Sequence, residues 1–114
     1  MRPDDRVRAK LWDMLQAAGE ARAMCEGLSF DEIAADRRTL LALERLMEIL
    51  GECARGVPEE FRLSYDDIPW RALIGMRNVL AHEYGSIDHK RHYLAATRDG
   101  VRLCEAIERL LAAG

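Results

Sequence analysis

The sequence has few of the residues that build β-sheets, and it has no long apolar run. Val, Ile and Thr are sparse among its 114 residues, and no stretch sustains an alternation of apolar and polar residues. No apolar run approaches the roughly 20 residues that a helix needs to cross a bilayer. These absences count against a β-sheet protein and against a membrane-spanning one.

Cysteine is also scarce, and its spacing offers no framework. The chain has three cysteines, Cys25, Cys53 and Cys104, which lie far apart and form no C-x-x-C pair. Each is embedded in an apolar stripe. An odd number of separated cysteines is typical of reduced core thiols, so we predict neither a disulfide framework nor a cysteine metal site.

The chain carries no large excess of charge. Its 17 basic and 20 acidic residues give a formal net charge of −3, so any polyanion that it binds must meet a local patch of positive charge. The charged start, MRPDDRVRAK, does not resemble a secretory signal, and we expect a cytoplasmic protein. With 49% apolar and 32% charged residues, the composition is that of one soluble globular domain spanning residues 1–114.

The apolar residues that are present recur mostly at steps of three and four, which predicts helices. We expect an all-α fold, an antiparallel up-down four-helix bundle with one or two short extra helices. The four long helices span about residues 5–26, 38–55, 68–84 and 89–112. A capping-box pattern predicts a short helix over 30–35, and residues 59–67 form a polar connector that could contain one helical turn.

The helix over 38–55 has a wide apolar stripe, which places it centrally. The last helix directs six residues toward the core, namely Leu94, Thr97, Val101, Cys104, Ile107 and Leu111. Trp12 and Trp70 lie either at a subunit contact or in the core.

The stretch RNVLAHEYGSID, residues 77–88, is unusual near the end of an amphipathic helix. Arg77 offers a permanent cation whose fork matches phosphate oxygens, and His82 can exchange a proton near neutral pH. Asn78 lies four residues before His82 and can orient the imidazole or a substrate oxygen. These groups suit metal-free RNA cleavage, in which an imidazole helps to deprotonate the ribose 2′-hydroxyl and the guanidinium stabilises the crowded phosphate.

Helix geometry limits how these groups can meet. Arg77 and His82 are separated by about 140° around an ideal helix. An unwound helix end before Gly85, or a second subunit across a two-fold axis, would bring the groups together. A purely structural interpretation also exists: His82 favours a helix C-terminus, Arg77 pairs with an acid such as Glu83, and Tyr84 packs under the turn.

Other polar residues have weaker patterns. His89 and His92 are three residues apart and could share a metal-ligand face, but no cysteine or carboxylate completes a usual zinc pattern beside them, and we predict no metal and no cofactor. Glu44, Glu48 and Glu52 repeat every four residues along the central helix, which is typical of a solvated face beside Arg45 and Arg55. Tyr65 and Tyr93 are expected to pack or to line the surface.

The run WRALIGMRNVLAHEYGSID, residues 70–88, closely resembles the signature of HepT-like toxins in the HEPN superfamily of all-helical ribonucleases. That signature is R-x-x-x-x-H-x-Y with a polar residue after the arginine, and Arg77, Asn78, His82 and Tyr84 fill it. The segments IPW and ILGEC also match. The likeness covers most of the chain in helix order and is strongest over residues 46–88.

The resemblance implies a helical bundle that forms homodimers, with the paired motifs lining a shared cleft. It implies metal-independent cleavage of RNA, in some members transfer RNA, with Arg77 and His82 catalytic and Asn78 assisting. The implied partner is a small nucleotidyltransferase antitoxin of the MntA type, which silences the toxin by adding AMP to the motif tyrosine, here Tyr84. Glu52 lies in the matching upstream segment and could support Arg77.

The chain departs from the family after the motif. Many members have an apolar or aromatic segment there, whereas this chain has HKRHYL, residues 89–94. That segment is either a basic RNA-contacting patch or a solvated first turn. Two further functions stay open: a non-catalytic subunit that binds a nucleotide or the nucleotidyltransferase, which the acidic net charge favours, and a purely structural dimer.

Overall fold

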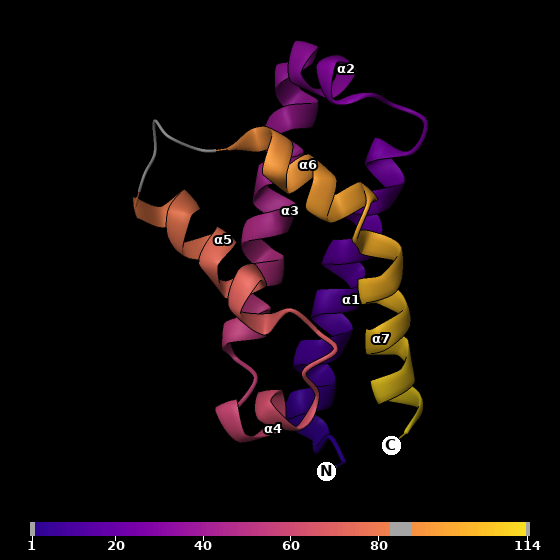
Figure 1. Ribbon diagram of the computed structural model, residues 1–114, viewed down its shortest axis with the longest axis vertical. Coiled ribbons are helices and arrows are strands. Elements are labelled where there is room, and N and C mark those ends of the chain that lie inside the picture. Colours follow the sequence, from indigo (N-terminus) through magenta and orange to yellow (C-terminus); the bar gives the residue numbers. More distant parts are fainter. Residues whose placement is uncertain (1, 83–87, 114) are drawn as a thin grey trace.

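The computed structural model describes residues 2–82 and 88–113, and for residues 77–82 it describes the backbone only. Within this part of the chain every regular element is a helix, as predicted (Figure 1). The helices are α1 (Asp5–Cys25), α2 (Phe30–Ala35), α3 (Arg37–Arg55), α4 (Glu59–Ser64), α5 (Trp70–His82), α6 (His89–Thr97) and α7 (Gly100–Ala112). The all-α fold class is therefore confirmed.

Capping side chains and a glycine in a left-handed conformation set where the first two helices begin and end. Asp4 caps α1 by accepting a hydrogen bond of 2.9 Å from the Val7 amide. Gly27 follows α1 with a φ of +75°, a conformation that residues with a Cβ rarely adopt. The predicted capping box of α2 is present, because Ser29 and Glu32 each accept from the other's backbone amide.

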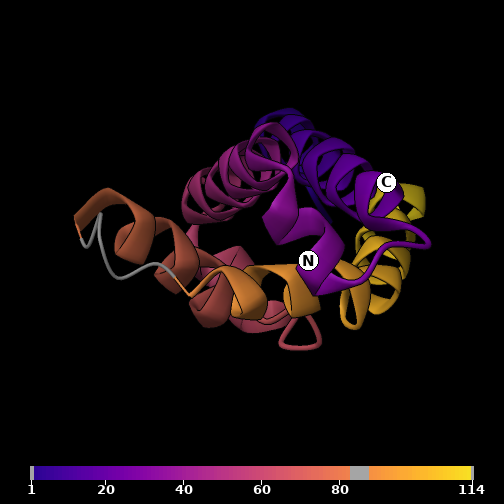
Figure 2. The ribbon, with the colours of Figure 1, turned by 90° about the horizontal axis from the view of Figure 1, so that it is seen from above.

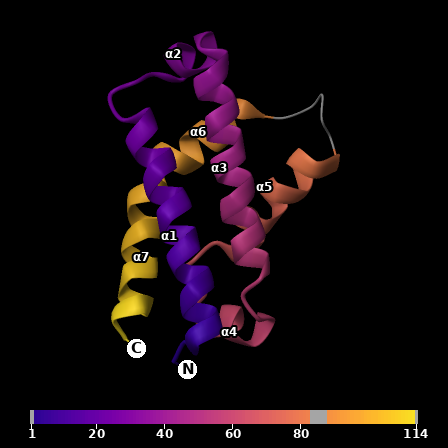
Figure 3. The ribbon, with the colours of Figure 1, turned by 180° about the vertical axis from the view of Figure 1, so that it is seen from behind.

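The long helices α1 and α3 run antiparallel and form one side of the molecule (Figures 1 and 3). Seen from above, α5 and α6 lie on the opposite side, and α7 flanks α1 (Figure 2). Helix α3 packs against α1, α2, α5 and α6, which confirms its central place. The core between these helices contains side chains at most 2% exposed, among them Leu11, Met14, Leu43, Met47, Leu50 and Ile107.

The predicted last helix is wrong as a single element. Residues 89–112 form two helices, α6 and α7, with a turn at Arg98 and Asp99 between them. Helix α6 crosses the end of the bundle, whereas α7 runs alongside α1 (Figure 1). Because the two helices take different directions, one apolar stripe cannot run through both, and Val101, a predicted core residue, is 44% exposed.

Smaller differences concern the middle of the chain. The polar connector contains a full short helix, α4, which buries Phe61 at 2% exposure. Helix α5 begins at Trp70 rather than at Ile68 and is described as far as His82. Of the two tryptophans, Trp70 belongs to the core at 6% exposure, and Trp12 is 55% exposed on α1.

Candidate functional site

Helix α5, which carries the motif, is anchored firmly at its first turn. Trp70 is buried, and its indole Nε1 donates a hydrogen bond of 2.8 Å to the carbonyl of Tyr65. Leu73 and Met76 are each 3% exposed and pack with α3. The apolar positions of α5 therefore hold its backbone against the central helix up to the residue before Arg77.

The predicted catalytic residues occupy the last two turns of this helix. Arg77, Asn78 and His82 have helical backbone in α5, and Asn78 and His82 are one turn apart there. Their side chains lie outside the described part of the structure, and so does all of Tyr84. The predicted convergence of the guanidinium and the imidazole, and the role of Tyr84, stay predictions.

A groove of about 300 Å³ separates α5 from α6 beside the motif. Ala72 and Met76 form its α5 wall, and the α6 side contributes the cations Lys90, Arg91 and Arg98 together with the acids Asp88 and Asp99. Met76, on the α5 wall of this groove, directly precedes Arg77 in the sequence.

The charges on the rim of this groove are not equally available. Asp88 caps α6 by accepting from the Arg91 amide at 3.0 Å, and Arg98 is paired with Asp99 at 3.2 Å. Lys90 and Arg91 are exposed, and among the described residues neither has an ion-pair partner within 4 Å. These two side chains are therefore available to contact an anion.

Arg91 also borders a second and larger groove, of about 1070 Å³, over α4 and α5. This groove brings in Arg62 and Arg71, together with the apolar surface of Leu63 and Ile74. The two grooves share Arg91 and Ala72, so they meet at the first turn of α6.

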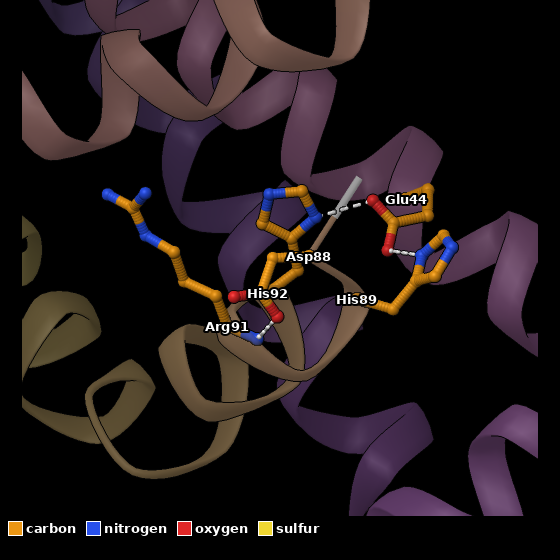
Figure 4. Close-up of polar contacts among 5 residues, drawn as sticks. All are labelled: Glu44, Asp88, His89, Arg91 and His92. Atoms are coloured by element: carbon orange, nitrogen blue, oxygen red, sulfur yellow. Dashed lines mark hydrogen bonds and ion pairs between the residues drawn. The ribbon is translucent and has the colours of Figure 1, made fainter. Parts of the chain in front are cut away.

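Glu44 lies in a setting that the sequence analysis did not predict. The residue is 7% exposed rather than solvated, and its carboxylate lies between the imidazole rings of His89 and His92 (Figure 4). His89 Nδ1 lies 2.6 Å from Oε1, and His92 Nδ1 lies 2.5 Å from Oε2. The solvated-face prediction is thus wrong for Glu44.

The other two glutamates of the series do face solvent. Glu48 is paired with Arg45 at 3.2 Å, and Glu52 is exposed. Since the Arg77 side chain lies outside the described residues, the proposed support of Arg77 by Glu52 is untested. A signal for Glu44 was present in the sequence: it falls in line with Leu40 and Met47 on the apolar stripe of α3.

In both histidines that could have shared a metal, Nδ1 contacts the Glu44 carboxylate instead. Within the described ranges, no group of three or more His, Cys, Asp or Glu side chains is placed to hold a metal ion.

All three cysteines are free thiols; Cys25 and Cys104 are buried and Cys53 is half-buried. Burial raises the pKa of each thiol above its ordinary value of 9.0.

None of the described helices is both long enough and apolar enough to span a membrane. The two tyrosines outside the motif, Tyr65 and Tyr93, pack as expected. The ring of Tyr65 lies 4.8 Å from that of Phe61 between centroids, and the Tyr93 hydroxyl donates to the Leu28 carbonyl at 2.5 Å.

Comparison with known proteins adds an independent observation. Residues 14–110 match the family model described as "Ribonuclease HepT-like". A protein of Methanocaldococcus jannaschii with a provisional RNase name is 31% identical over 83 residues, which cover 73% of this chain and 76% of that one. A second protein of that organism, also provisionally named an RNase, is 32% identical over 88 residues, or 77% of this chain and 73% of the relative.

A third relative comes from Thermococcus cleftensis and has the provisional name ribonuclease HepT. It is 32% identical over 80 residues, which cover 67% of this chain and 73% of the relative. The comparison with solved structures finds no significant match.

Proposed function

The chain belongs to the family of HepT-like ribonucleases, and from this membership we propose that it is an endoribonuclease that cleaves RNA without a metal ion. The observation that carries the proposal is the family match across residues 14–110, which contains the complete series Arg77, Asn78, His82 and Tyr84. The positions of Arg77 and His82 on the last turns of α5 are consistent with it.

In the proposed reaction, His82 accepts the proton of a ribose 2′-hydroxyl while the 2′-oxygen attacks the adjacent phosphorus. The bond from phosphorus to the 5′-oxygen breaks, and that oxygen takes a proton from an imidazolium, which the second subunit's copy of His82 supplies. The products are a 2′,3′-cyclic phosphate and a free 5′-hydroxyl. Arg77 stabilises the extra negative charge on the phosphate, and Asn78 orients the imidazole or a substrate oxygen.

The grooves beside α5 support RNA as the ligand. Lys90 and Arg91 are exposed cations without described ion-pair partners at the rim of the smaller groove. The net charge of −3 makes such a local patch necessary for any nucleic-acid contact. Requirement for the 2′-hydroxyl would make the enzyme spare DNA.

The first prediction tests the catalytic assignment. His82→Ala and Arg77→Ala should each lower RNA cleavage by a factor of roughly 100 or more, because each removes a group that acts only in the transition state. Purified variants are incubated with labelled RNA in the presence of EDTA, and growth is followed on expression of each variant. Arg6→Ala, an exposed cation on α1, is the matched control and should cut at the rate of the parent.

Cleavage by His82→Ala at the parent rate would refute the assignment of the catalytic residues. Cleavage that EDTA abolishes would refute the metal-free reaction.

Regulation by a nucleotidyltransferase is the second part of the proposal. The cognate enzyme would transfer AMP from ATP to the phenolic oxygen of Tyr84, releasing pyrophosphate. Each adenylate adds bulk and negative charge two residues from His82, which would repel RNA and block the site. A homodimer in the cytoplasm, with two motifs across a two-fold axis, completes the proposed arrangement.

The second prediction concerns this modification. Co-expression with a cognate nucleotidyltransferase should raise the intact mass by one or more adenylates and suppress RNA cleavage. Tyr84→Phe should keep cleavage and lose the mass increase, because it removes only the acceptor oxygen, and Tyr93→Phe is the matched control. A mass increase that persists in Tyr84→Phe would place the modification elsewhere.

The net charge of −3 favours one alternative, a non-catalytic subunit that binds a nucleotide or the nucleotidyltransferase. Purified parent protein that leaves all cellular RNA intact, yet forms a stoichiometric complex with the nucleotidyltransferase, would support this alternative over the ribonuclease.

A further inference from the structure

Glu44, His89 and His92 form a polar cluster where α3 and α6 pack together. Glu44 comes from the apolar stripe of α3, and both histidines come from the first turn of α6 (Figure 4). His92 is only 2% exposed, whereas the His89 side chain is 36% exposed. Each carboxylate oxygen has its own imidazole partner, so both Nδ1 atoms can donate to one ionised carboxylate.

Stability alone gives little reason for this cluster. A buried carboxylate is costly unless it is fully hydrogen-bonded, and apolar side chains of similar size often replace such a buried polar set without loss of stability. Hydrogen bonds differ from apolar contacts in that they fix direction as well as distance. The cluster therefore defines how the first turn of α6 sits on α3 more sharply than apolar packing would.

The position of this turn matters for the motif, because α3 supports both flanking helices. Helix α5 packs on α3, and so does α6, but the groove of about 300 Å³ separates α5 from α6, which share little direct packing in the described ranges. Helix α6 also packs on α1, which itself packs on α3, so the relative placement of α5 and α6 is transmitted through α3 both directly and by way of α1. Glu44 lies at the α3–α6 junction, and Lys90 and Arg91 follow directly on α6.

We propose that Glu44 is a positioning residue for RNA cleavage, which acts through His89 and His92 to hold the first turn of α6 at a fixed distance from α5. The inference rests on the proposed ribonuclease function. In it, the cluster sets the width of the groove between α5 and α6, which receives the RNA. Misplacement of a binding group by about 1 Å can cost roughly 100-fold in rate. The cluster keeps Lys90 and Arg91 in place relative to Arg77.

The decisive experiment separates geometry from stability. Glu44→Met and His92→Leu each leave a buried polar partner unsatisfied, so each single variant should unfold at lower urea concentration than the parent. The double variant Glu44→Met/His92→Leu removes both buried members and should recover most of that loss, since His89 is exposed enough to reach solvent. We expect the double variant to remain folded and to cut RNA about 10- to 100-fold more slowly in kcat/KM.

A conservative pair of variants tests the hydrogen bonds themselves. The side-chain amide nitrogen of asparagine occupies nearly the position of histidine Nδ1, so His89→Asn and His92→Asn keep a donor for Glu44. Both should retain kcat/KM within about threefold of the parent. Rescue by asparagine, but not by leucine, identifies the hydrogen bonds to Glu44 as the active feature.

Each failure has its own meaning. A stable double variant that cuts at the parent rate would overturn the positioning role and leave the ribonuclease function intact. Loss of cleavage in His89→Asn, with His92→Asn unaffected, would also overturn it, because His89 would then act through its other ring nitrogen. Parent protein that leaves RNA intact in the same assay would refute the proposed function, and with it any role of Glu44 in cleavage.

Discussion

Arg91 is the residue at which the two grooves of the molecule meet. It is exposed, its backbone amide is held by Asp88, and its side chain points away from the Glu44 cluster (Figure 4). A guanidinium in this position can contact a phosphate of an RNA that lies along α5 without taking part in proton transfer. Its contribution therefore belongs to binding rather than to the chemical step.

The third prediction follows from this position. Arg91→Ala should raise KM for RNA several-fold and leave kcat nearly unchanged, because it removes one phosphate contact. The slope of log binding constant against log salt concentration should fall in magnitude by about one, measured by fluorescence anisotropy with a labelled oligoribonucleotide. Arg6→Ala, which removes an exposed cation from the first turn of α1, should change neither quantity. An unchanged salt slope for Arg91→Ala would exclude a phosphate contact.

Single residues also show where sequence patterns failed. The spacing of Glu44 to Glu48 and Glu52 matches an acidic row and predicts a solvated face for Glu44. The same residue lies on the row of Leu40 and Met47, and burial was decided by α6 covering that row. Which neighbour covers a helix face is a tertiary fact, so spacing along one helix could not decide between the two interpretations.

At the scale of the elements, the helices are set mainly by local signals. The capping box at Ser29, the cap at Asp4 and the positive φ of Gly27 mark boundaries that the sequence predicts to within a residue or two. These boundaries depend on interactions within four residues, which is why a single sequence contains them.

The fourth prediction contrasts two glycines of α1 and its C-terminal turn. Gly19→Ala should raise the free energy of unfolding by about 0.5–1 kcal/mol, because alanine favours a helix interior and nothing lies within 4 Å of the added Cβ. Gly27→Ala should lower the free energy of unfolding by about 1 kcal/mol. The added Cβ would meet no neighbour, so the loss comes from the φ of +75°, which is strained for alanine. Urea unfolding of the two variants gives both values. Equal effects of one sign would contradict the helical role of Gly19 or the turn role of Gly27.

The break between α6 and α7 shows the limit of local signals. The residues from 89 to 112 have a continuous helical pattern, and only Gly100 weakens it. The turn forms because α6 crosses the bundle end, where it packs on α1 and α3, while α7 lies along α1. A Cβ added at Gly100 would make only ordinary contacts, at 3.7 Å from Ala95 and Arg22, so steric crowding at the glycine does not cause the break. The packing of distant helices fixes the break, and no short window of sequence contains that information.

At the scale of the whole molecule, the fold class followed from composition and periodicity. A 114-residue chain with apolar stripes on every long helix and few β-branched residues can bury those stripes only in a helical bundle. Residue spacing and family resemblance predict the candidate site. Of this site, the structure describes the position of the motif on α5 and the grooves beside it. The mutual placement of Arg77, His82 and Tyr84 involves side chains outside the described part of the chain and stays a prediction.

The fifth prediction concerns the stability of the molecule at high pH. Burial raises the pKa of Cys25 and Cys104 above 9.0, so the folded state favours the neutral thiols. A raised folded pKa means that the folded chain binds more protons than the unfolded chain above pH 9, and the stability from these thiols is lost as pH rises through that range. The free energy of unfolding should therefore fall from pH 8 to pH 10.

The control for this prediction is the double variant Cys25→Ala/Cys104→Ala. It should be less stable at pH 8, but its loss between pH 8 and pH 10 should be smaller than that of the parent, as measured by urea unfolding. An equal loss in both proteins would assign the effect to other groups.

The contrasting environments of the two tryptophans give the protein a built-in optical reporter. Trp70 is buried at the first residue of α5, and Trp12 stands in solvent on α1. Their fluorescence should differ in emission wavelength and in access to a soluble quencher such as iodide. With Trp12 replaced by phenylalanine, the remaining fluorescence would come from Trp70, at the start of the helix that carries Arg77 and His82. Ligand binding near this helix could then be followed without an added dye.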